Sequence, residues 1–193
     1  MPSLEYEVVQ YVTFMDSQDL SYRTFVETGT WLGHTIFRME NHFDELHTIE
    51  ISEKFYRDAK NKYTGDKISF HLGDTSEVLK DIVPKLSNNT FFFLDAHYSG
   101  GDTGRGDKDC PLIEEIEIIH SSFKPSAIII IDDFRLFGTN SFEDWSQISK
   151  QKILNIVKDR MKTEYHCPSD IDEKDRWVIH MSEQRKVESN GVA

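Results

Sequence analysis

Three aspartates follow the two most apolar segments of the sequence. Asp95 ends the run TFFFLD at 90–95, and Asp132 and Asp133 follow AIIII at 127–131. If these runs are neighbouring parallel strands, three carboxylates meet at one sheet edge, where like charges repel unless a cation lies between them. Oxygen ligands of this kind suit Mg²⁺ or Mn²⁺. We predict a divalent metal at Asp95, Asp132 and Asp133; the alternative is that each aspartate caps the turn after its strand.

His97 stands two residues beyond Asp95, and imidazole accepts protons near neutral pH. We predict His97 as a catalytic base, with Asp95 as the rival base and a structural or substrate-contacting role for His97 as the alternative. The segment 99–109, SGGDTGRGDKD, contains four glycines among polar residues, as suits a lid or a binding loop. We expect an acceptor to contact His97, Tyr98, Asp102 and Arg105; a plain solvated loop is the alternative.

A glycine loop follows the first predicted strand, TFVET at 24–28, in the sequence Glu27-Thr28-Gly29-Thr30-Trp31-Leu32-Gly33. Gly29 permits a tight turn, and Gly33 permits close approach to the start of the next helix. Trp31 occupies the place of the middle glycine in the dinucleotide fingerprint. The Glu27 carboxylate would repel a pyrophosphate but suits an ammonium group. An ordinary strand-to-helix turn is the alternative.

Two further acids follow the next strands. Glu50 ends the second predicted strand, 21 residues after Gly29, where a carboxylate can accept hydrogen bonds from both hydroxyls of a ribose. Gly73 and Asp74 follow the third strand. Asp74 has two compatible roles, as acceptor for an exocyclic amine such as that of adenine and as the cap of the next helix.

The elements that position these residues alternate along the chain. Apolar runs and amphipathic segments form five strand–helix units, and the predicted strands at 163–167 and 176–181 form a terminal hairpin. We predict an α/β fold: a doubly wound, mostly parallel, Rossmann-like sheet of seven strands, with helices on both faces and a C-terminal antiparallel hairpin. Ligands of such sheets bind at the carboxyl ends of the strands.

Length and charge exclude several classes of protein. The 193 residues have the size of one domain, so we predict a single domain over 1–193 with its core at about 24–181 and a disordered tail at 182–193. The net charge is −12 without a basic cluster, so we expect no nucleic-acid partner. No apolar run approaches the roughly 20 residues of a membrane span, and no signal peptide begins the sequence. We therefore expect a cytoplasmic protein with no membrane partner and with Cys110 and Cys167 as free thiols.

The set Glu27-x-Gly29-x-x-x-Gly33, Glu50, Gly73-Asp74 and Asp95 resembles the class I S-adenosylmethionine-dependent methyltransferases over about 24–181. Asp95, Asp132 and Asp133 further resemble the metal-dependent O-methyltransferases of the catechol type and the macrocin-like sugar type. The resemblance implies S-adenosylmethionine as cofactor, with Glu27 and Gly29 along its methionine part, Glu50 at the ribose, Asp74 at the adenine, and a Mg²⁺ on the three aspartates. The implied cofactor contacts are Glu27, Thr28, Gly29, Thr30, Gly33, Glu50, Gly73, Asp74 and Asp95.

We therefore expect an O-methyltransferase acting on a hydroxyl of a small polyol, with a sugar preferred to a catechol and a divalent metal orienting the hydroxyl. The expected partner is a small-molecule or glycan acceptor. Two alternatives stay open, an NAD-type oxidoreductase on the same fold and a non-catalytic cofactor-binding domain. A homodimer and a place as one domain of a larger glycan-processing protein are also open.

Overall fold

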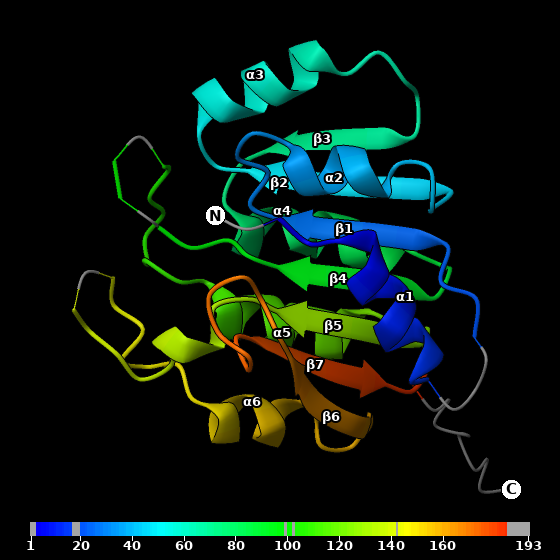
Figure 1. Ribbon diagram of the computed structural model, residues 1–193, viewed down its shortest axis with the longest axis vertical. Helices are drawn as coiled ribbons and strands as arrows, with labels where there is room; N and C mark the ends of the chain where they lie inside the picture. The colour runs from blue at the N-terminus through cyan, green and yellow to red at the C-terminus, as the bar shows by residue number, and fades with distance from the viewer. Residues whose placement is uncertain (1–2, 17–19, 99, 102, 142, 185–193) are drawn as a thin grey trace, which may run out of the picture.

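The computed structural model describes residues 3–16, 20–98, 100–101, 103–141 and 143–184. Seven strands form one sheet in the order β3-β2-β1-β4-β5-β7-β6 (Figure 1). The first five strands are parallel, and β7 runs antiparallel to both β5 and β6. The strands are β1 (Thr24–Thr28), β2 (Glu45–Glu50), β3 (Ile68–Leu72), β4 (Thr90–Leu94), β5 (Ala127–Ile131), β6 (Met161–Cys167) and β7 (Arg176–Met181). This confirms the predicted sheet and its C-terminal hairpin.

The central strands are buried on both faces, which explains their unbroken apolar sequences. All five residues of β4 and all five of β5 are buried. Because neighbouring residues of a strand point to opposite faces, Phe92 and Ile129 join one core cluster, and Phe91 and Ile128 join the other. The sheet thus divides the interior into two apolar layers.

Helices cover both layers, as predicted. One layer packs under α4 (Thr75–Ile82), α5 (Leu112–Ser122) and α6 (Lys150–Val157). The other packs under α1 (Tyr6–Phe14) and α2 (His34–Met39), while α3 (Glu53–Lys62) contacts β2 and β3. Two short 3₁₀ helices, η1 (Val83–Lys85) and η2 (Phe134–Leu136), complete the described elements. In Figure 1, α1 and α2 lie in front of the sheet and α5 behind it.

The first strand of the terminal hairpin is longer than the sequence predicts. It was expected from 163 and begins at Met161. Cys110 and Cys167 are buried free thiols. Among the described residues, no helix combines the length and the apolar character needed to cross a bilayer. The tail predicted at 182–193 falls mainly on 185–193, which lie outside the described residues.

Candidate cofactor and transfer site

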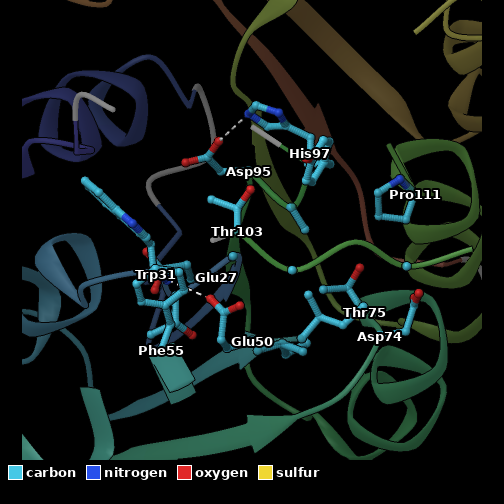
Figure 2. A pocket seen from close by; sticks show the side chains of 18 of the residues that line it. Glu27, Trp31, Glu50, Phe55, Asp74, Thr75, Asp95, His97, Thr103 and Pro111 are labelled. Carbon is cyan, nitrogen blue, oxygen red and sulfur yellow. Dashed lines mark hydrogen bonds and ion pairs between the residues drawn. The ribbon is translucent and has the colours of Figure 1, made fainter. Parts of the chain in front are cut away.

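A deep pocket opens at the carboxyl ends of β1, β2 and β4, where the topology predicts a ligand. It encloses about 870 Å³ of empty space, counting the part open to solvent. Figure 2 shows acidic side chains from separate strand ends around this one space. The residues predicted from the sequence that line it are Glu27, Gly29, Thr30, Glu50, Asp74, Asp95, His97 and Tyr98. Thr28, Gly33, Gly73, Arg105, Asp132 and Asp133 are not among its lining residues.

The glycine loop has the backbone conformation that its sequence predicted. Gly29 has φ +86°, and a Cβ there would stand 2.6 Å from the carbonyl oxygen of Asp95. Gly33 has φ +80° and forms the N-cap of α2. Trp31, which takes the place of a glycine, is itself in the left-handed region at φ 44°. The loop therefore keeps a glycine-type turn although its middle residue carries an indole.

The Glu50 carboxylate is held in place by two backbone donors. The amide of Trp31 donates to one carboxylate oxygen, and the amide of Ser52 donates to the other, each at 2.8 Å. Burial raises the pKa of Glu50 although these hydrogen bonds oppose the rise. An oriented carboxylate at the pocket wall can accept hydrogen bonds from a pair of vicinal hydroxyls.

Glu27 lies deeper and is 2% exposed. The Thr48 hydroxyl donates to its carboxylate at 2.8 Å. Burial, reinforced by the negative charges of Asp95 and Glu50, raises the pKa of Glu27 well above its usual range. A positively charged group brought beside this carboxylate would favour its ionised form, so the position suits an ammonium group.

Asp74 has the capping role that its place in the sequence predicted. Its carboxylate accepts hydrogen bonds from the Ser76 amide at 2.9 Å and from the Ser76 hydroxyl at 2.7 Å, at the N-terminus of α4. The same side chain lines the pocket. Its contact with an adenine stays a prediction.

The glycine-rich loop after β4 passes over this part of the pocket. A Cβ on Gly104 would collide with the Ile51 side chain, and a Cβ on Gly106 would collide with the Asp74 carboxylate. Two of the four glycines thus let the loop lie directly against Ile51 and Asp74. Arg105 between them is not among the lining residues; its Nε atom lies 2.6 Å from Oδ1 of Asp109, and its guanidinium lies 5.0 Å from the centre of the Tyr98 ring. The predicted acceptor contact Asp102 lies outside the described residues.

His97 joins the ends of β4 and β5. Its Nε2 atom is 2.6 Å from Oδ2 of Asp133 and 3.6 Å from Oδ1 of Asp95 (Figure 2 marks the latter contact). Its Nδ1 atom is 2.7 Å from Oε2 of Glu143. These three carboxylates raise the pKa of His97 well above its usual range, although burial acts in the opposite direction. The three carboxylates therefore favour the imidazolium form of the ring.

The paired aspartates after β5 have arginine partners. Nε of Arg176 is 3.4 Å from Oδ1 of Asp132, and Arg135 binds both Asp133 and Asp175. Burial raises the pKa of Asp132 to about 8. In contrast, His97 and Arg135 hold the pKa of Asp133 below its usual range, although its burial opposes the effect. The two acids that are adjacent in sequence therefore have different surroundings.

Within the described residues, two donor groups have ligand atoms within 4.8 Å of one another: Asp95 with His97 and Asp133, and Asp132 with Asp133 and Asp175. The predicted trio of Asp95, Asp132 and Asp133 is divided between these two groups. The metal prediction rested on carboxylates without a compensating cation, and here His97, Arg135 and Arg176 contact those carboxylates. A metal ion in the first group would need His97 as a neutral ligand, and one in the second group would compete with Arg135 and Arg176 for the carboxylates, so the metal stays a prediction.

Sequence reasoning missed Glu143, Arg135, Asp175 and Arg176. Arg135 lies two residues after Asp133, and Arg176 is the first residue of a predicted strand. The position of each in the sequence therefore indicated that it lies near the strand ends. Glu143 and Asp175 lie in irregular segments. Nothing in their local sequence indicates that they meet the ends of β4 and β5.

Comparison with solved structures identifies the fold. N-methyltransferase NodS from Bradyrhizobium japonicum aligns with a TM-score of 0.57 and 10% identity, covering 93% of this chain and 96% of that one. A candidate caffeoyl-CoA O-methyltransferase from Staphylococcus aureus aligns with a TM-score of 0.61 and 15% identity, covering 94% and 85%. CalS10, an amino pentose methyltransferase from Micromonospora echinaspora with its S-adenosylmethionine bound, aligns with a TM-score of 0.57 and 6% identity, covering 92% and 89%.

No protein-family model matches the sequence, and no curated protein matches it. At identities of 6–15% the structural likeness shows the fold alone. The chain has the fold of S-adenosylmethionine-dependent methyltransferases.

Proposed function

We propose that the protein is an S-adenosylmethionine-dependent O-methyltransferase whose acceptor is a small polyol, with sugars as the first class to screen. The observation that carries the proposal is the pocket itself, in which Glu27, Glu50 and Asp95 come from the ends of three neighbouring strands of a methyltransferase fold. The solved structures of this fold include one with S-adenosylmethionine and one with S-adenosylhomocysteine.

The described donors and acceptors fit that cofactor. Glu50 offers an oriented carboxylate to the ribose hydroxyls, and Asp74 stands further along the same pocket for the adenine amine. Glu27 offers a buried carboxylate to the ammonium group of the methionine part, and the positive charge of that group would favour the ionised form of the carboxylate. An NAD-type cofactor is disfavoured because its pyrophosphate would meet Glu27 and Trp31 at the glycine loop.

Asp95 is the proposed proton acceptor. When bound, the cofactor supplies an activated methyl group; a carbon–oxygen bond forms as the carbon–sulfur bond breaks, and the hydroxyl proton must leave. Oδ1 of Asp95 is buried and accepts no hydrogen bond from the described residues. Burial raises the pKa of Asp95, and a raised pKa makes the carboxylate a stronger base. His97, whose imidazolium form the carboxylates favour, would instead compensate the charge of the Asp95–Asp133 pair.

The proposed reaction uses no metal ion, because the protein's own cations compensate the carboxylates at the ends of β4 and β5. The charge of the pocket also bears on the acceptor. Its lining includes the carboxylates of Glu27, Glu50, Asp74, Asp95 and Asp109, whereas the two groups that can compensate them, His97 and Lys108, are already bound to Asp133 and Glu114. An uncharged polyol suits this lining better than a phosphorylated acceptor, whose charge the carboxylates would repel.

Thermal unfolding with added ligand tests the proposal. S-adenosylhomocysteine at 100 times its dissociation constant adds about 2.7 kcal/mol to the free energy of unfolding, which raises Tm by roughly 5–10 °C in a domain of this size. We expect this shift with S-adenosylhomocysteine and not with NAD⁺, and we expect it to be the same in EDTA as in Mg²⁺.

The matched controls are Glu50→Ala, which should abolish most of the shift, and Glu53→Ala, an exposed acid of α3 that should leave it unchanged. A shift with NAD⁺ alone would overturn the cofactor assignment. A shift that requires Mg²⁺ would overturn the metal-free arrangement. Acceptors are then screened for methyl transfer from labelled cofactor, beginning with neutral sugars.

A further inference from the structure

Glu143 is an acidic residue of the segment between β5 and α6. Its side chain contacts His97, which also lies beside Asp95 and Asp133. Its Oε2 atom lies 2.7 Å from Nδ1 of His97. The same oxygen accepts a hydrogen bond from Nε1 of Trp145 at 2.9 Å. The Glu143 side chain is 11% exposed, so the contact is shielded from solvent. Hydrogen bonds to an ionised carboxylate are among the stronger ones in proteins.

The His97 ring thus has carboxylates at both ends. Asp133 and Asp95 lie at the Nε2 end, and Glu143 lies at the Nδ1 end. The Trp145 ring also packs against the imidazole, with 5.2 Å between ring centres and 63° between the planes. The His97 side chain is 5% exposed, so its charge is costly unless these partners compensate it.

The two segments that contain His97 and Glu143 are joined at a second point. The Asp144 amide donates to the Asp109 carboxylate at 3.1 Å, and the Tyr98 amide donates to the Asp109 carbonyl at 2.8 Å. The chain after β4 and the chain after β5 are therefore held together beside the pocket. In this frame Glu143 reaches the imidazole from the side opposite to Asp95.

We propose that Glu143 is a positioning residue, which holds His97 in a fixed orientation between the chain segments after β4 and β5 and so keeps Asp95 ready for the proton transfer. The consequence for turnover rests on the proposed function. The effect on His97 does not, because it follows from the contacts alone.

Imidazole NMR tests the contact directly. In protein labelled with ¹⁵N-histidine, the signals of His97 are assigned by their loss in His97→Gln. We expect Glu143→Gln to shift the Nδ1 signal of His97 and to speed the exchange of the proton on that nitrogen, because the substitution removes the charged acceptor that lies 2.7 Å away. Asp144→Asn, which removes the neighbouring exposed charge, is the matched control and should leave the His97 signals in place. Identical His97 signals in wild type and Glu143→Gln would overturn the proposal.

Kinetics separate a positioning role from a general structural one. We expect Glu143→Gln to lower kcat by about tenfold or more while the dissociation constant of S-adenosylhomocysteine changes by less than about threefold. In a His97→Gln background the same substitution should have little further effect, since interacting residues are non-additive. Full additivity would overturn the proposal.

A variant that keeps the charge guards against a folding failure. Glu143→Asp retains the carboxylate but shortens its reach, so we expect a smaller loss of kcat than in Glu143→Gln and a displaced Nδ1 signal. Equal values of kcat in wild type, Glu143→Asp and Glu143→Gln would overturn the proposal. If wild type fails to bind S-adenosylhomocysteine, the proposed function fails, but the NMR comparison still decides whether Glu143 holds His97.

Discussion

Asp95 belongs both to the cofactor pocket and to the group of charged residues around His97. Its backbone amide donates to Thr28 at the end of β1, and its side chain lines the pocket and lies beside His97. This places one carboxylate beside both proposed reactants. The neighbouring His97 has the complementary task of compensating charge, because carboxylates stand at both of its nitrogens.

Asp95→Asn is the residue-scale test of this assignment. Asparagine has the same shape but cannot take up the hydroxyl proton, so we expect kcat to fall by at least about a hundredfold. The dissociation constant of S-adenosylhomocysteine should change far less, since Glu27 and Glu50 remain. Steady-state kinetics and calorimetric titration provide the two measurements. Unchanged turnover would remove Asp95 from the mechanism and leave Glu27 as the carboxylate to test next.

At the scale of elements, the site depends on how closely the strand ends approach each other. β1 and β4 are neighbours, and the turn after β1 crosses the end of β4 at Gly29. A Cβ at Gly29 would meet the backbone carbonyl of Asp95, which cannot rotate out of the way as a side chain can. The loop at 103–106 uses glycine in a second way, since Gly104 and Gly106 let it lie against Ile51 and Asp74 without a positive φ.

Gly29→Ala and Gly138→Ala form a matched pair for this point. Both glycines have positive φ, at +86° and +75°, so alanine is strained at each. Only at Gly29 would the new Cβ also meet backbone, whereas at Gly138 nothing lies within 4 Å. We expect Gly138→Ala to cost about 1 kcal/mol of unfolding free energy and Gly29→Ala distinctly more. Denaturant unfolding measures both, and equal losses would contradict the close approach of the two strand ends.

At the scale of the whole molecule, burial raises the pKa of several interior acids. Glu115 on α5 is 1% exposed, and burial raises its pKa to about 8. Burial also raises the pKa of Asp132 to about 8, and it raises the pKa of Glu27 well above its usual range. Between the usual pKa of a carboxylate and these values, the folded protein binds more protons than the unfolded chain. The free energy of unfolding therefore falls as pH rises through this window.

The corresponding prediction concerns the ligand-free protein. Its unfolding free energy should be lower at pH 8.5 than at pH 6, and Glu115→Gln should reduce that difference. Glutamine resembles the protonated acid, so the variant should match wild type near pH 6 and exceed it at pH 8.5, where the buried carboxylate of wild type ionises at a cost. Urea unfolding at the two pH values makes the measurement. If the variant and wild type lose stability equally, the raised pKa of Glu115 is refuted.

The sequence by itself determined the order of the elements, the parallel sheet with its terminal hairpin, and the pocket residues that stand at strand ends, such as Glu27, Glu50 and Asp95. These follow from local patterns, because apolar runs specify buried strands and the topology brings their carboxyl ends to one edge. Only the tertiary structure decided which cations compensate the acids. Glu143 meets His97 across 46 positions and Arg135 meets Asp175 across 40, both through irregular segments. No periodic pattern in the sequence predicts such contacts, because the two partners come together only when the whole chain has packed.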